Sequence, residues 1–146
     1  MALTFDDPVL GELTYDHEFE WWDGQTDLGG HPAELRVQAE RDCPSDPAAR
    51  RTLGAALTRL RETEGRVRAA VATRLLDLAE DWRDDEDDPE PLTIASVMAR
   101  IVPTSVELTP DGGATLYYAD GELFAGHIIL AGVDASGHVT SAGIAG

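Results

Sequence analysis

Residues 33–40 alternate strictly between apolar and polar side chains, and this pattern limits the fold more than any other feature of the chain. The apolar positions are Ala33, Leu35, Val37 and Ala39, and the polar positions are Glu34, Arg36, Gln38 and Glu40. Side chains of a β-strand point alternately to opposite faces, so the pattern predicts a half-buried strand. Its polar face should meet water.

Further strands are predicted on both sides of a helical region. Two short strands, 11–16 and 18–22, join near Asp16, and Trp22-Asp23-Gly24 is typical of a turn. The last third of the chain predicts a four-stranded antiparallel meander over residues 105–109, 114–119, 123–133 and 138–144. Turn residues separate these strands at 110–113, 120–121 and 134–137.

Helices are predicted between the two groups of strands. Ser45-Asp46-Pro47 is a helix start, and the apolar stripe that follows includes Leu53, Leu57, Leu60, Val67, Val71, Leu75, Leu78 and Trp82. Gly65 interrupts the stripe, and both one long helix and a helix hairpin over 46–83 are compatible with it, because a glycine costs only about 1 kcal/mol relative to alanine. Thr93 should cap a short helix with Ile94, Val97, Met98 and Ile101 on one face.

The order of strands, then helices, then strands predicts an α+β fold. We expect an antiparallel sheet built from the N- and C-terminal strands, with the central helices packed on one face. The length of 146 residues is close to the commonest size of one domain, so 1–146 is predicted to be a single domain.

The charge of the chain is strongly negative, because 28 acidic residues oppose 11 arginines and the net charge is -17. Carboxylates repel a phosphate backbone, so direct nucleic-acid binding is not expected. Only residues 45–83 are net basic, with eight arginines and six acids. Residues 84–88 are all acidic and precede prolines, which predicts an extended, solvated linker.

The expected compartment is the cytoplasm. The chain has one cysteine, which cannot form an intrachain disulfide, and its N-terminus lacks the basic and apolar segments of a signal peptide. An apolar stretch long enough to cross a bilayer is also missing, so no membrane association is predicted.

Two segments resemble a family of uncharacterised bacterial domains. One is the N-terminal Asp7-Pro8-Val9-Leu10-Gly11-Glu12-Leu13-Thr14-Tyr15-Asp16, and the other is the C-terminal stretch around Phe124, Gly126 and His127. The resemblance covers most of the chain and implies a shared fold. It implies no catalytic residues.

His127 is the strongest single candidate for a catalytic or metal-binding residue, because histidine transfers protons near neutral pH and binds metals. A structural role in its strand is favoured over a catalytic one. Asp16, His17, Glu18 and Glu20 suggest a metal site, but strand alternation sends His17 and Glu18 to opposite faces. We therefore expect no metal, no cofactor and no catalytic residue.

Trp21 and Trp22 are adjacent in a predicted strand, so one indole should be buried and the other exposed. An exposed tryptophan surrounded by acids suits a basic protein surface. The predicted partner-binding residues are Trp21, Trp22, Glu18, Glu20, Asp23, Asp84, Asp85, Glu86, Asp87 and Asp88.

The predicted function is therefore an acidic protein-binding domain, and its specific form is an immunity protein that covers the active site of a basic bacterial toxin. The alternative is an enzyme or small-ligand-binding domain with a site near His127, and a deep pocket beside His127 with converging carboxylates would favour it. A third hypothesis is a structural module that pairs through a sheet edge. The oligomeric state is open.

Overall fold

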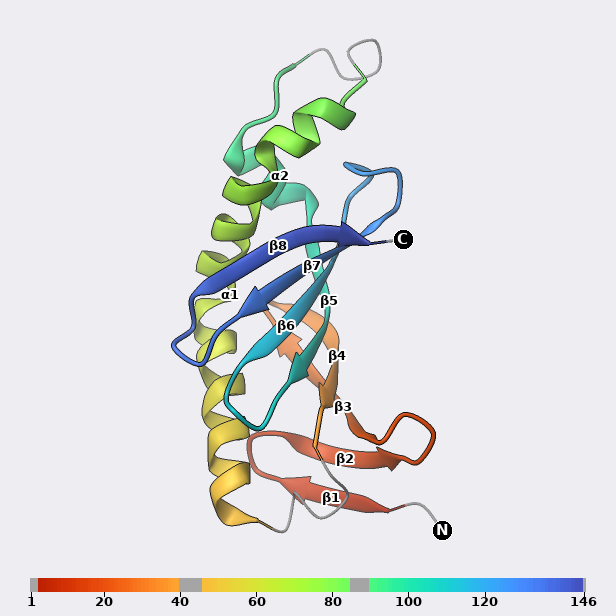
Figure 1. Cartoon of the computed structure of the whole chain (residues 1–146), viewed down its shortest axis with the longest axis vertical. Coiled ribbons are helices and arrows are strands. Elements are labelled where there is room, and N and C mark those ends of the chain that lie inside the picture. Colours follow the sequence, from red (N-terminus) through yellow and green to blue (C-terminus); the bar gives the residue numbers. More distant parts are fainter. Residues whose placement is uncertain (1–2, 40–45, 85–89, 146) are drawn as a thin grey trace.

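The computed structural model describes residues 3–39, 46–84 and 90–145, which form eight strands and two helices (Figure 1). The N-terminal strands are β1 (Thr4–Asp7), β2 (Gly11–Asp16), β3 (Trp21–Leu28) and β4 (His31–Val37). The helices are α1 (Pro47–Trp82) and α2 (Ile94–Arg100). The C-terminal strands are β5 (Val102–Leu108), β6 (Ala114–Ala119), β7 (Ile128–Val133) and β8 (Val139–Ala145).

All described strands belong to one sheet, and their order in the sheet is their order in the sequence. Every neighbouring pair is antiparallel except β4 and β5, which run parallel with Leu35 opposite Val106. Parallel neighbours need a crossover connection, and the two helices supply it. The predicted α+β fold, with a sheet drawn from both ends of the chain and helices between them, is confirmed.

The core lies between α1 and one face of the sheet, and α1 runs alongside the strands for most of the length of the molecule (Figure 1). The predicted alternation is confirmed for the described residues, because Ala33, Leu35, Val37 and Ala39 are all buried, although β4 ends at Val37. Glu40 lies outside the described residues. On the opposite sheet face, β4 carries the polar side chains of Glu34 and Arg36. Helix α2 packs on α1.

Helix α1 is a single helix of 36 residues, which answers the question that Gly65 left open. Asp46 caps it by accepting a hydrogen bond from the Ala48 N–H at 3.0 Å, and Pro47 occupies the first turn. Within the described residues, neither helix has the length and apolar character needed to cross a bilayer.

Gly65→Ala should stabilise the fold by about 1 kcal/mol, because alanine loses less backbone entropy in a helix. Gly65 is exposed, and an added Cβ would meet nothing within 4 Å. Urea denaturation followed by circular dichroism measures the change. Loss of stability would indicate that α1 is not a continuous helix at this residue.

Helix α2 begins as predicted. Thr93 Oγ1 accepts from the Ser96 N–H at 3.0 Å, and Ser96 Oγ accepts from the Thr93 N–H at 2.8 Å, which completes a capping box. Val97 and Ile101 are buried, whereas Ile94 remains exposed.

Three strand predictions are wrong in detail. Trp22-Asp23-Gly24 lies inside β3, because Gly24 serves close packing: a Cβ there would lie 2.8 Å from Leu13 Cδ2. Residues 18–20 belong to the turn before β3, and residues 123–127 form a loop rather than the start of β7. Strand β1 was not expected.

Candidate functional site

The turn between β2 and β3 places an aromatic ring on the surface. Asp16 Oδ1 accepts from the Glu18 N–H at 2.9 Å and from the Phe19 N–H at 3.1 Å. An aspartate that bonds backbone groups two and three residues ahead is a common way to close such a turn. The geometry leaves the Phe19 side chain 57 % exposed.

Phe19 stacks on Trp21, which lies on the sheet face opposite α1. Their ring centroids are 4.8 Å apart and the planes differ by 17°. The Arg36 guanidinium lies 4.8 Å from the centre of the Trp21 ring, on the neighbouring strand β4. Stacking and the cation–π contact both favour this arrangement and hold the indole in place.

Acidic side chains from two strands surround Arg36. Its Nη2 lies 3.3 Å from Glu34 Oε2, and its Nη1 lies 3.7 Å from Glu107 Oε1. The Tyr117 hydroxyl donates to Glu107 Oε1 at 3.0 Å, which extends the network to β6. We call this region the Trp21 surface. It consists of Phe19, Trp21, Asp23, Glu34, Arg36, Glu107 and Tyr117.

Burial raises the pKa of Asp23, and the nearby acids Asp16 and Glu34 raise it further, against opposing effects of Trp21 and Arg36. The folded protein therefore loses stability by ionising Asp23, and this loss disappears as the pH falls through the raised pKa. A carboxylate in this position would gain from a cation on a partner. Burial is also the main cause that raises the pKa of Tyr117, followed by Glu107.

The structure places the predicted partner-binding residues differently. Trp21 is half-buried at the surface, Asp23 lies beside it, and Glu18 and Glu20 are exposed in the turn. Trp22 is only 2 % exposed and packs in the core against Tyr15, so a partner cannot reach it and it is removed from the predicted set. Asp84 is exposed, whereas Asp85, Glu86, Asp87 and Asp88 lie outside the described residues.

A buried carboxylate organises the loop between β6 and β7. Asp120 is 5 % exposed, and its Oδ2 accepts from the Phe124 N–H at 2.8 Å and from the Gly126 N–H at 2.9 Å. Its Oδ1 accepts from the Glu122 N–H at 3.1 Å. The loop that contains Phe124, Gly126 and His127 therefore has a fixed backbone.

Residues 7–144 match the model of DUF2262, a family described as an uncharacterized protein conserved in bacteria. The chain belongs to the DUF2262 family. This finding confirms the predicted resemblance to an uncharacterised bacterial family, and the region matched includes both the Trp21 surface and the Asp120 loop. Comparisons with curated proteins and with solved structures gave no match.

In this DUF2262 chain, His127 helps to close its own loop. Its Nδ1 lies 2.6 Å from the Phe124 carbonyl oxygen, and its ring meets Trp82 edge to face at 5.4 Å. Among the described residues, no carboxylate pairs with His127. The same part of the chain contains no group of three or more His, Cys, Asp or Glu side chains that could hold a metal ion.

Sequence reasoning missed five members of the candidate site, which are Phe19, Glu34, Arg36, Glu107 and Tyr117. Alternation placed Arg36 on the polar face of its strand, which was a usable indication. Phe19 was missed because residues 18–20 were predicted to belong to a strand, whereas they form the turn that Asp16 closes. Glu107 and Tyr117 depend on which strands are neighbours, because Glu107 lies opposite Arg36 only through the parallel pairing of β4 and β5.

Proposed function

We propose that this DUF2262 chain is a binding domain for a basic protein and that the Trp21 surface makes the contact. The observation that supports this most is the stack of an exposed Phe19 on a half-buried Trp21, on a sheet face that the two helices leave uncovered and bordered by carboxylates. Aromatic side chains supply much of the binding energy at protein interfaces, and complementary charge selects the partner and speeds its encounter.

The charge of the region favours a cationic partner over an anionic one. Asp23, Glu34 and Glu107 outnumber Arg36, and the adjacent turn adds Asp16, Glu18 and Glu20. Arginine or lysine on the partner would lie over the aromatic rings and pair with these acids. The acidic run 84–88 remains a second predicted contact region.

The specific form of the proposal is an immunity protein that neutralises a basic toxin in the cytoplasm. Carboxylates held on a rigid sheet would occupy positions that substrate phosphates take in a nuclease. The enzyme alternative has less support, because no carboxylate among the described residues pairs with His127, whose Nδ1 is hydrogen-bonded to the Phe124 carbonyl oxygen.

The test begins with a partner captured from a bacterial lysate on the immobilised chain, whose binding kinetics are then measured. Phe19→Ala and Trp21→Ala should each weaken affinity by about thirtyfold, mainly through the off-rate, as expected for interface anchors. Ile94→Ala is the matched control, because Ile94 is also exposed and apolar but lies on α2. Circular dichroism checks that each variant is folded.

Charge is tested separately by two double variants that remove the same net charge. Glu18→Gln with Glu20→Gln should slow association, whereas Glu62→Gln with Asp77→Asn on α1 should not. Association should also slow by about tenfold between 50 and 300 mM salt. The proposal fails if all variants bind the partner with the same affinity and association rate, or if the association rate does not depend on salt concentration. If the chain is an immunity protein, the wild type should inhibit the toxic activity of the captured partner, and the Phe19→Ala variant should not.

A further inference from the structure

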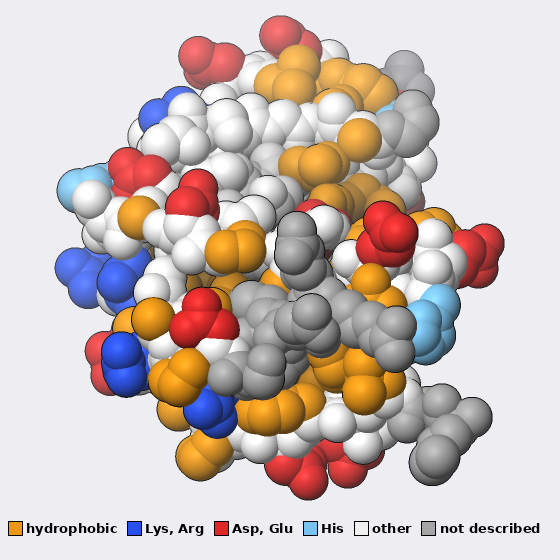
Figure 2. Space-filling model, turned by 60° about the horizontal axis from the view of Figure 1, so that its bottom comes forward, with side chains coloured by type: hydrophobic (Ala, Val, Ile, Leu, Met, Phe, Trp, Pro, Cys, Tyr) orange, Lys and Arg blue, Asp and Glu red, His pale blue; other side chains and the backbone are white. Residues whose placement is uncertain are grey.

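A cavity of about 340 Å³ lies between α1 and the hairpin that joins β7 to β8. Its lining residues are Arg59, Thr63, Arg66, Val67, Ala70, Ser136, Gly137, His138 and Val139. None of them is acidic, although the chain has 28 acidic residues. Viewed from the end where α1 begins, the basic side chains lie on one side of the molecule, whereas acidic side chains occur both among them and over the rest of the visible face (Figure 2).

The spacing of α1 side chains brings two guanidinium groups to this cavity. Arg59 and Arg66 are seven residues apart, so they lie on one face of α1, about 10 Å apart along its axis. Arg59 Nη1 donates to the Ala135 carbonyl oxygen at 2.6 Å, which leaves its other N–H groups available. Among the described residues, Arg66 has no ion pair or hydrogen-bond partner.

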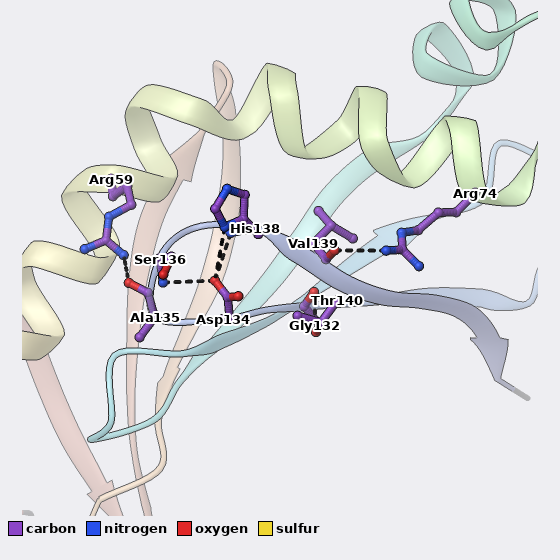
Figure 3. Close-up of polar contacts among 9 residues, drawn as sticks. All are labelled: Arg59, Arg74, Gly132, Asp134, Ala135, Ser136, His138, Val139 and Thr140. Atoms are coloured by element: carbon purple, nitrogen blue, oxygen red, sulfur yellow. Dashed lines mark hydrogen bonds and ion pairs between the residues drawn. The ribbon is translucent and has the colours of Figure 1, made fainter.

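The hairpin forms the opposite wall and is held firmly. Arg59 and Arg74 reach from α1 to its backbone, with His138 between them in this view (Figure 3). Asp134 Oδ1 accepts from the Ser136 N–H at 2.9 Å and from the His138 N–H at 3.0 Å. The His138 N–H is the main cause that lowers the pKa of Asp134. This carboxylate is thus used by the turn and does not line the cavity.

The polar groups available in the cavity are mostly donors. Arg66 offers a whole guanidinium group, Arg59 offers its remaining N–H groups, and Ser136 offers a hydroxyl. A ligand that matches them needs several acceptor oxygens and negative charge, which a phosphate group has. Val67, Ala70 and Val139 add apolar surface for an organic part. The volume is within the range of small-molecule sites.

We propose that this cavity binds a small phosphorylated organic molecule, with Arg66 and Arg59 holding the phosphate. It shares no residue with the Trp21 surface, so the two proposals are independent. Arg66 supplies the bidentate contact, Ser136 adds a hydrogen bond, and the apolar residues hold the organic part.

The test titrates the chain with glucose 6-phosphate, inorganic phosphate and glucose, followed by NMR of the backbone amides. Glucose 6-phosphate and inorganic phosphate should shift the signals of Ser136, Gly137 and His138, and glucose should not. Arg66→Gln should weaken phosphate binding by at least about tenfold, because a charge-assisted bidentate contact is lost. Arg66 has no ion pair or hydrogen-bond partner among the described residues and is exposed, so this variant should fold normally.

Arg51→Gln is the matched control, since it removes the same charge from an exposed part of α1. It lies 15 residues before Arg66, about 22 Å along the helix axis and beyond the Debye length at physiological salt. The phosphate affinity of the Arg51→Gln variant should differ from that of the wild type by less than about twofold. The proposal would be overturned if the NMR signals shift only outside the hairpin, or if neither glucose 6-phosphate nor inorganic phosphate binds. It would also be overturned if Arg66→Gln and Arg51→Gln lose phosphate affinity equally.

Discussion

Asp120→Ala should lower the free energy of unfolding by about 3 kcal/mol, because three backbone N–H groups lose a charged acceptor. The hydrogen bond from the Phe124 N–H to Asp120 is buried, so this donor is shielded from bulk solvent. Gly126 and Glu122 lose the same partner. Urea denaturation measures the loss, and His127 and Trp82 should change their NMR signals because the loop holds their contact.

Asp120→Asn should cost less, because one amide oxygen can still accept from Phe124 and Gly126. Asp111→Ala is the control at an exposed turn, where Asp111 Oδ1 accepts from the Gly113 N–H at 2.8 Å. Water can replace that bond, so the loss there should stay below about 1 kcal/mol. Similar losses for Asp111→Ala and Asp120→Ala would contradict the role assigned to burial.

Arg68→Met should destabilise the fold by about 3 kcal/mol, because it leaves the Glu64 carboxylate in the core without its cation. Glu64 is 2 % exposed, and its Oε2 lies 3.4 Å from Arg68 Nη2. The Tyr118 hydroxyl donates to Glu64 Oε1 at 3.4 Å. Burial raises the pKa of Tyr118, so this hydroxyl stays protonated and keeps donating. Thermal and urea unfolding measure the loss.

The double variant Glu64→Gln with Arg68→Met should recover most of this stability, because it leaves no buried charge. Arg61→Met is the control on the same helix, where the guanidinium donates to Thr26 Oγ1 at the surface. Its loss should stay below about 1 kcal/mol. If the double variant is less stable than Arg68→Met alone, the buried charge is not the cause of the loss.

The local patterns of the sequence determined much of the fold. Alternation over residues 33–40 identified the buried face of β4, and Thr93 identified the start of α2, because both depend only on neighbouring residues. The order of strands and helices was enough to predict the α+β class. Gly24 and the stretch 123–127 were misinterpreted, because the first needs the position of Leu13 and the second needs the bonds made by Asp120.

At the candidate surface, the sequence by itself indicated that one of the two adjacent tryptophans would be buried. It could not say which, since alternation is symmetric until a sheet face is covered. In the folded protein the Trp22 side chain lies in the core on the sheet face that α1 covers, whereas Trp21 lies on the other face and stacks with Phe19.

The tertiary structure alone decided which distant residues meet. Glu107 reaches Arg36 because β4 and β5 pair in parallel, and Glu64 reaches Tyr118 because α1 packs on the sheet face from which the buried Tyr118 side chain projects. The β7–β8 hairpin lies against the arginines of α1 for the same kind of reason. Such contacts depend on strand order and on where one long helix crosses the sheet, and neither is set by interactions between residues close in sequence.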